Sequence, residues 1–157
     1  ADAPVSRWRG VALADRATRV VDRIDNALPA EVRQQCHDLW AEGLAAPVFD
    51  GPPVWVHGDL HPANLIVSDG ALSAVIDFGD LTSGDPSGDL SVAWMMFGPD
   101  ERAIFRAAAG GCDDATWVRA RTNALAHAAM CLGASSDDPV IAAIGHATLK
   151  SVLADTA

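Results

Sequence analysis

Residues 54–80 read VWVHGDLHPANLIVSDGALSAVIDFGD, and this stretch decides the fold. Its first three residues form an apolar run that is typical of a short strand, and residues 57–64 form the loop that follows. Two more apolar runs, at 65–67 and 72–76, flank the pair Asp69-Gly70. An Asp-Gly pair between apolar runs is a strong hairpin signal, so we expect a small β-hairpin directly after the loop.

The predicted hairpin brings three oxygen-bearing side chains together. Asn64 precedes its first strand and Asp77 follows its second, so the two residues lie side by side where the hairpin opens. Asp59 belongs to the loop that leads into the same strand. Two carboxylates and an amide oxygen are ligands that hard cations such as Mg²⁺ prefer, together with phosphate oxygens. The spacing therefore predicts an oxygen-rich site for a divalent cation.

Helices are expected on both sides of this stretch. Apolar residues at helical spacing and helix-capping residues predict helices over 11–27, 29–47, 89–97, 100–109, 113–132 and 138–154. The helix over 89–97 is apolar on nearly every side and should be buried. Residues 79–88 are rich in Gly, Asp and Ser and are expected to form a loop.

The motifs around the loop resemble those of the aminoglycoside phosphotransferase family, whose members are small-molecule kinases. His57-Gly58-Asp59 matches the His-x-Asp of a kinase catalytic loop, Asn64 falls at the matching offset, and Asp77-Phe78-Gly79 reads as Asp-Phe-Gly. The resemblance is strongest over 54–97 and extends loosely over nearly the whole chain. It implies an α+β, mainly helical fold: a protein-kinase-like C-terminal lobe over 1–157 with a short β-hairpin beside the catalytic loop.

The resemblance also implies a role for each motif residue. Asp59 matches the catalytic Asp, which accepts a hydrogen bond from the acceptor hydroxyl and takes its proton late in phosphoryl transfer. Asn64 and Asp77 match the two magnesium ligands, which bridge Mg²⁺ to the phosphates of ATP.

Three supporting residues have more than one interpretation. His57 matches the family His that packs and hydrogen-bonds within the loop, and His61 either donates to the transferred phosphate or supports its neighbours. His57, Asp59 and His61 can instead be read as the metal ligands of a metallohydrolase, although Pro62 interrupts a regular strand there. Asp89 resembles the helix Asp that anchors the catalytic-loop backbone, and its alternative role is an ordinary helix N-cap.

The sequence has no Gly-rich phosphate-binding motif, and its only lysine is Lys150. Kinases of this type hold ATP with a Gly-rich loop and a strand lysine that belong to an N-terminal lobe. We therefore expect the ATP-clamping N-terminal lobe to be missing from this chain, and the isolated chain to be inactive.

The charge is strongly acidic and unevenly placed. The formal net charge is −10, and no Lys or Arg occurs between Arg33 and Arg102. Such a chain is a poor nucleic-acid binder, and it contains no apolar run of membrane-spanning length. The three cysteines form no CxxC pair, which favours a reducing, cytoplasmic location.

The resulting hypothesis is ATP- and Mg²⁺-dependent phosphorylation of a small-molecule hydroxyl. The leading acceptor is an aminoglycoside-type antibiotic, a polycation. Alternatives are choline, homoserine, a sugar amine or a macrolide, or a catalytically silent kinase-like binding domain. Six acids are candidates for holding a polycation, with helix capping as the alternative: Asp100, Glu101, Asp113, Asp114, Asp137 and Asp138.

Overall fold

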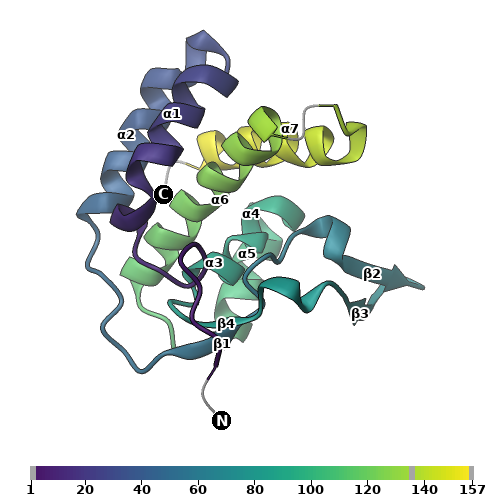
Figure 1. Cartoon of the computed structure of the whole chain (residues 1–157). Helices are drawn as coiled ribbons and strands as arrows, with labels where there is room; N and C mark the ends of the chain where they lie inside the picture. The colour runs from purple at the N-terminus through teal and green to yellow at the C-terminus, as the bar shows by residue number, and fades with distance from the viewer. Residues whose placement is uncertain (1–2, 135–136, 156–157) are drawn as a thin grey trace.

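The long helix α6 (Asp114–Ala134) lies at the centre of the structure, and other helices pack around it (Figure 1). The structure is a computed structural model and describes residues 3–134 and 137–155. Helix α6 is lined with small residues, and Ala120, Ala124 and Ala128 have no exposed surface. Short side chains let neighbouring helices approach α6 closely on several sides. The α+β, mainly helical fold predicted from the sequence is thereby confirmed.

Two helices near the N-terminus pack on α6 and confirm the first two predicted helices. Each begins as a short 3₁₀ turn, so the α-helical part starts later than the sequence predicted. The four elements are η1 (Leu13–Arg16), α1 (Ala17–Ala27), η2 (Ala30–Val32) and α2 (Arg33–Ala45). Val20, Ile24 and Leu28 are buried in the core, as their helical spacing predicted.

Helix α2 packs very close to α6 at Gly43. A Cβ atom at this position would overlap the side chain of Thr122, whose hydroxyl donates a hydrogen bond to the Val118 carbonyl 2.9 Å away. That hydrogen bond fixes the Thr122 side chain, so the contact has little room to relax.

We expect Gly43→Ala to lower the free energy of unfolding by about 1–3 kcal/mol, because overpacking forces the two helices apart. Urea unfolding followed by circular dichroism measures the change. Gly88→Ala is the matched control, since Gly88 is also helical and a Cβ there meets nothing within 4 Å. Equal stability of the two variants would show that α2 and α6 are not in close contact.

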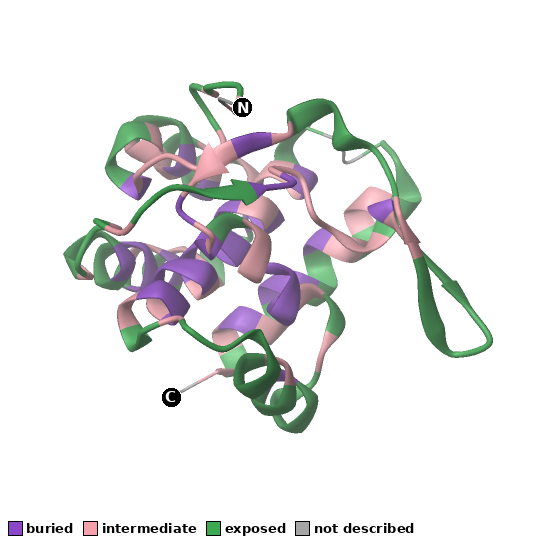
Figure 2. Cartoon of the chain, turned by 90° about the horizontal axis from the view of Figure 1, so that it is seen from below, coloured by how far each residue is buried: buried purple, intermediate pink, exposed green. Residues whose placement is uncertain are grey.

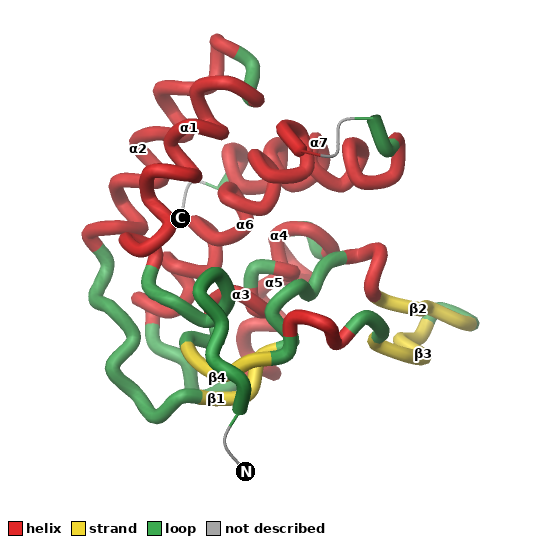
Figure 3. The backbone as a smooth tube through the Cα atoms, in the orientation of Figure 1, coloured by secondary structure: helices red, strands yellow, loops and turns green. Residues whose placement is uncertain are grey.

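There are two separate antiparallel strand pairs, one at the bottom of the view in Figure 3 and the other projecting to the right. Strand β1 (Val54–Val56) pairs with β4 (Thr82–Gly84), with Val54 opposite Gly84. Strand β2 (Leu65–Ser68) pairs with β3 (Ala71–Val75), as the hairpin signal predicted. The loop prediction for residues 79–88 was wrong in part. Thr-Ser-Gly is too short and polar to read as a strand, and it becomes one only by pairing with β1.

The β2–β3 hairpin projects from the body of the molecule, with most of its residues exposed (Figure 2). Its turn residues Asp69 and Gly70 have φ angles of 52° and 77°. Two consecutive positive φ angles are typical of a type I′ turn, for which Asp-Gly is a preferred pair.

The single buried helix predicted over 89–97 is instead two short helices. They are α3 (Ser87–Leu90) and α4 (Val92–Met96), and the Ser91 hydroxyl between them donates to the Gly88 carbonyl at 2.6 Å. A hydrogen bond from a Ser side chain to the preceding turn competes with helix continuation. Val92, Ala93 and Trp94 are buried, as the apolar pattern predicted, although Met96 is exposed.

The remaining helices follow the sequence prediction. They are α5 (Pro99–Ala109) and α7 (Pro139–Ala154), in addition to α6. Asp138 caps α7 by accepting hydrogen bonds from the backbone of Val140 and Ile141. Asp113 binds the backbone and hydroxyl of Thr116 at the start of α6. Across the described ranges, none of the helices is both long and apolar enough to cross a membrane.

Candidate active site

The loop over 57–64 is held in place by Asp89 of α3. The two oxygens of the Asp89 carboxylate accept hydrogen bonds from the backbone of His57, at 2.6 Å, and of Gly58, at 3.0 Å. Asp89 does not cap its own helix, because Pro86 is the residue before α3 and no side-chain cap is formed there. A carboxylate bound to two N–H groups is a strong anchor, since hydrogen bonds to a charged group are short and strong.

The backbone of this loop requires glycine at position 58. Gly58 has a φ of +85°, and a Cβ there would collide with the carbonyl oxygen of Asp80. Of the residues that could stand between His57 and Asp59, glycine is therefore the one that lets the loop pack against Asp80.

His57 ties the loop to the segment that follows the hairpin. Its Nε2 lies 2.9 Å from the Ile76 carbonyl oxygen, and its Nδ1 accepts a hydrogen bond from the Asp59 backbone at 3.3 Å. Its ring also packs on Phe78, with 4.7 Å between ring centroids. Because both ring nitrogens of His57 already have protein partners, His57 is a structural residue in this arrangement and not a metal ligand.

Asn64 lies at the junction of the loop and the hairpin. Its side-chain Nδ2 donates to the Asp59 carbonyl at 2.9 Å, while its backbone carbonyl accepts from Ile76 at 3.0 Å. The second bond brings the chain after β3 alongside Asn64, and Asp77 is the next residue. Through these two bonds, Asn64 is linked to Asp59 and to the residue before Asp77, so the three residues are neighbours at the open end of the hairpin.

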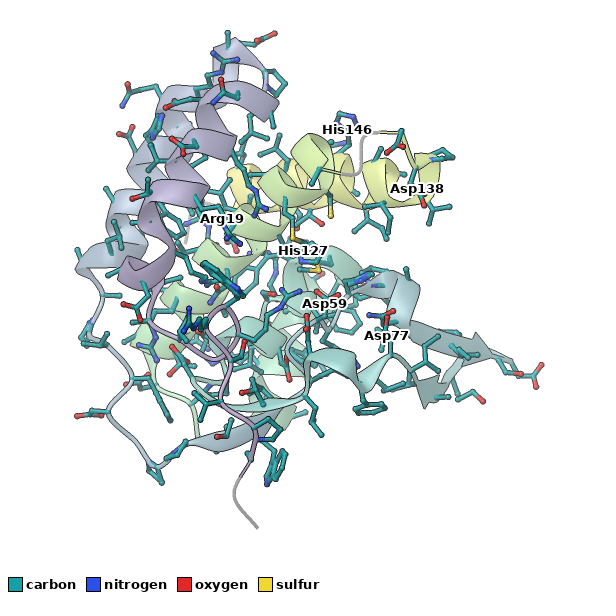
Figure 4. All side chains as sticks on the ribbon, in the orientation of Figure 1. Arg19, Asp59, Asp77, His127, Asp138 and His146 are labelled. Atoms are coloured by element: carbon teal, nitrogen blue, oxygen red, sulfur yellow. The ribbon has the colours of Figure 1, made fainter. Side chains whose placement is uncertain are left out.

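Asp77 differs from the other two in conformation and exposure. Its backbone is left-handed, with φ 62° and ψ 63°, and its side chain is exposed beside the hairpin (Figure 4). A left-handed residue other than glycine is uncommon and is often found where function requires a particular side-chain direction.

His61 makes only long contacts with the other predicted site residues. Its Nε2 lies 3.6 Å from Asp59 Oδ2 and 3.3 Å from Asn64 Nδ2. Its Nδ1 is buried and has no hydrogen-bond partner within the described part of the chain. His61 therefore contacts the Asp59 carboxylate and the Asn64 amide through Nε2, while its Nδ1 is buried.

The donor set suits Mg²⁺ bound together with a nucleotide. In residues 3–134 and 137–155, no three His, Cys, Asp or Glu side chains are placed to hold a metal ion between them. This argues against the metallohydrolase interpretation of His57, Asp59 and His61. Asn64 directs its amide nitrogen to the loop, which leaves its Oδ1 available, and the Asp77 carboxylate is exposed. One or two protein oxygens completed by phosphate oxygens and water is the usual environment of Mg²⁺.

Comparison with known proteins decides the family. The model of the phosphotransferase enzyme family (APH) matches residues 1–123, well over half of the chain. The chain belongs to this phosphotransferase family. The resemblance inferred from the motifs is thus confirmed. No curated protein and no solved structure matches the chain significantly.

An arginine that the sequence motifs did not indicate binds the central carboxylate of the phosphotransferase. Arg9 donates from one nitrogen to Asp59 Oδ1 at 2.7 Å and from another to Asp80 Oδ2 at 2.9 Å. The N-terminal segment is held beside β4, because Ser6 donates to Thr82 and Gly10 accepts from the Asp85 backbone. These contacts deliver Arg9 to the site from 50 residues away in sequence.

The Asp59 carboxyl is kept ionised by these neighbours. Burial acts to raise its pKa, but His61 and the Arg9 guanidinium outweigh burial and hold the pKa below its usual value. Asp59 is therefore a carboxylate at neutral pH. It is ready to accept a hydrogen bond, and it is a weak base.

A second histidine lies behind His61. His127 of α6 has its ring 5.2 Å from the His61 ring, close to Asp59 (Figure 4). Burial, followed by the nearby His61, lowers the pKa of His127 to about 4, against an ordinary value of 6.5. The groups that face it are His61, Asp59 and Arg9.

We expect the stability of the phosphotransferase to fall as the pH falls from 6.5 to about 4. The unfolded chain binds a proton on His127 over this range and the folded chain does not, so the loss is on the order of 3 kcal/mol. Urea unfolding of the wild type and of His127→Gln at pH 7 and pH 4.5 measures it. His127→Gln should lose less stability on acidification, whereas His146→Gln, which alters an exposed histidine of α7, should behave as wild type. Equal acid sensitivity of all three proteins would contradict the assignment.

A buried ion pair stabilises the start of α3, the helix that carries Asp89. Arg119 of α6 bonds Asp85 at 2.8 Å, and both side chains are almost fully buried, with exposed fractions of 4% and 8%. Asp85 also accepts a hydrogen bond from the Ser87 backbone at 2.9 Å, which fixes the start of α3. The pair thus holds the helix that carries Asp89.

Proposed function

We propose that this phosphotransferase moves the γ-phosphoryl group of ATP to a hydroxyl of a small molecule, with Mg²⁺ as cofactor. The observation that carries the proposal is the grouping of Asp59 and Asn64, on a loop whose backbone is anchored by Asp89, with Asp77, which follows the hairpin. Membership of the phosphotransferase family supports the reaction type. Placing and stabilising the reacting groups is most of what phosphoryl transfer demands of a protein.

In the proposed reaction, Asp59 receives a hydrogen bond from the acceptor hydroxyl. The acceptor oxygen forms a bond to the γ-phosphorus as the bond between that phosphorus and the ADP oxygen breaks, and the hydroxyl proton passes to Asp59. Asn64 Oδ1 and the Asp77 carboxylate are the groups that would hold Mg²⁺, which neutralises phosphate charge when bound. The lowered pKa of Asp59 suits a group that orients the hydroxyl and takes its proton late.

We further propose that the groups that clamp ATP come from an N-terminal lobe outside this sequence. Lys150, the only lysine, is an exposed residue of α7. Several apolar side chains near the site are exposed and suit a second lobe packed against this face. They are Trp55, Ile66, Val67, Leu72, Ile76 and Phe78.

The test is an ATP-consumption screen of the full-length protein against a panel of alcohols, amino sugars, sugar acids and antibiotics. We expect ATP consumption that depends on one acceptor class and stops when EDTA removes Mg²⁺. Mass spectrometry of the acceptor should show one added phosphoryl group. Tight ATP binding with no phosphorylated acceptor would instead favour the silent binding domain.

A further inference from the structure

A cavity of about 220 Å³ opens next to Asp59. The N-terminal segment, α1, α3 and α6 form its walls, whereas Asn64 and Asp77 do not line it. Figure 4 shows Arg19 of α1 on one side of Asp59 and Asp77 on the other. The cavity is therefore separate from the residues proposed to hold Mg²⁺ and ATP. It reaches the same carboxylate from the other side, where an acceptor must lie.

Four arginines line this cavity: Arg9, Arg16, Arg19 and Arg23. The last three are spaced by three and four residues, so they share one face of the η1–α1 segment. Arg9 is already paired with Asp59 and Asp80. Among the residues that the structure describes, Arg16, Arg19 and Arg23 form no salt bridge.

The contacts of these three arginines include no salt bridge within the described residues, although the charges of Asp85 and Asp15 partly oppose the lowering of the Arg16 pKa by burial and by Arg9. Arg16 binds the Asn123 side chain, but its Nε is buried and has no partner within the described residues. The Arg19 guanidinium lies over the ring of Trp8, 3.7 Å from its centroid. Burial lowers the pKa of Arg23, and the nearby charges of Arg19 and Arg9 lower it further.

Four aspartates also line the cavity, but each is already bound: Asp59, Asp80, Asp85 and Asp89. Arg9 binds the first two, Arg119 binds the third, and the loop backbone binds the fourth. Positive and negative groups are thus separated within one small space. The aspartates lie on the side of the loop, the Asp-Phe-Gly segment and α3, and Arg16, Arg19 and Arg23 form a basic wall on the η1–α1 segment. A molecule that fits this pattern has a hydroxyl at one end and a negative charge at the other.

The acids that were candidates for a polycationic acceptor do not line this cavity. Asp113 and Asp138 cap α6 and α7, and Asp114 pairs with Arg106. Asp100, Glu101 and Asp137 are exposed at or near the starts of α5 and α7. The cavity is also smaller than the roughly 300–1,000 Å³ of pockets for drug-sized ligands, which favours a small acceptor.

We propose that this cavity binds the acceptor, and that the acceptor is a small alcohol bearing a carboxylate or phosphate group. Arg16, Arg19 and Arg23 hold the anionic group, while the hydroxyl faces Asp59. Arginine suits this role because its planar guanidinium binds carboxylate and phosphate through two parallel hydrogen bonds. The assignment of the anion as acceptor rests on the phosphotransfer function proposed above.

Equilibrium binding without ATP tests the charge of the ligand. Calorimetry on the full-length protein compares four hexose probes: gluconate, glucose 6-phosphate, neutral glucose and cationic glucosamine. At least one of the two anions should bind tenfold or more tightly than glucose, and its affinity should fall with added salt. The proposal is overturned if glucosamine binds more tightly than both anions, or if neither anion binds better than glucose.

Variants locate the site. Arg19→Gln and Arg23→Gln should each weaken anion binding about tenfold, the usual loss for a hydrogen bond between charged groups. Arg7→Gln is the matched control, because Arg7 is an exposed arginine of the N-terminal segment that does not line the cavity. Thermal melting checks that each variant is folded. Equal losses in all three variants, or no loss in the first two, would overturn the proposal.

The outcome is separable from that of the phosphotransfer proposal. Anion binding that requires Arg19 and Arg23, together with no phosphorylation of any acceptor, would keep the anion site and reject the phosphotransfer function. Phosphorylation of a cationic acceptor without an effect of Arg19→Gln or Arg23→Gln would keep the function and reject the anion site.

Discussion

Asp59→Asn should lower kcat for acceptor phosphorylation by about a thousandfold while leaving ATP affinity nearly unchanged. The substitution keeps the shape of the side chain, but it removes the negative charge that orients the hydroxyl and accepts its proton. Asn64 bonds the backbone carbonyl of residue 59, not its side chain, so the loop should keep its conformation. Steady-state kinetics and ATP titration of the full-length protein measure both quantities.

Asp80→Asn is the matched control for this prediction. Asp80 also binds Arg9, but it lies after the Asp-Phe-Gly motif, so its substitution should change kcat by less than the Asp59 substitution. If Asp59→Asn retained turnover within tenfold of the wild type, Asp59 would not be the group that handles the acceptor proton.

Arg119→Met should lower the free energy of unfolding by about 3–5 kcal/mol, the largest stability effect expected in the chain. The substitution leaves the Asp85 carboxylate buried, with the Ser87 backbone as its remaining hydrogen-bond partner among the described residues. The unpaired charge must then be protonated or exposed, and either change loosens α3. Urea unfolding at pH 7 measures the loss.

Two further variants separate the buried charge from the lost packing. The double variant Asp85→Asn with Arg119→Met removes both charges and keeps a side-chain oxygen for Ser87, so it should be more stable than Arg119→Met alone. Arg106→Met breaks an exposed pair with Asp114 and should cost less than about 1 kcal/mol. A loss as small for Arg119→Met as for Arg106→Met would show that the buried pair does not support the fold.

Sequence alone predicted the parts of the fold that depend on local signals. The Asp69-Gly70 turn, the apolar faces of α1 and α2, and the caps of α6 and α7 are set by residues close together in the chain. The same holds for the geometry of the site, because two short strands necessarily bring Asn64 and Asp77 together. Strand β4 was missed, since only its pairing partner β1, about 28 residues earlier, makes it a strand.

The basic residues of the site were not predictable from motifs. The segment between Arg33 and Arg102 contains no Lys or Arg, yet Arg9 and Arg119 from outside it pair with Asp59 and Asp85. These contacts join residues 50 and 34 positions apart, and no local pattern reports such a pairing. A periodic signal did exist for the basic wall, because Arg16, Arg19 and Arg23 follow helical spacing on one face of the η1–α1 segment. Its significance depends on which side of α1 faces Asp59, and only the fold determines that side.

The central claim is that the loop over 57–64 and Asp77 form one magnesium- and nucleotide-binding site. The most direct measurement is ATP affinity of the full-length protein with Mg²⁺ and with EDTA, for the wild type, Asp77→Asn and Asp69→Asn. Asp69 is the matched control, because it is an exposed left-handed aspartate at the far end of the same hairpin. We expect Mg²⁺ to raise ATP affinity tenfold or more in the wild type and in Asp69→Asn, and Asp77→Asn to abolish this gain. ATP binding that is indifferent to Mg²⁺, or an equal loss in both variants, would contradict the claim.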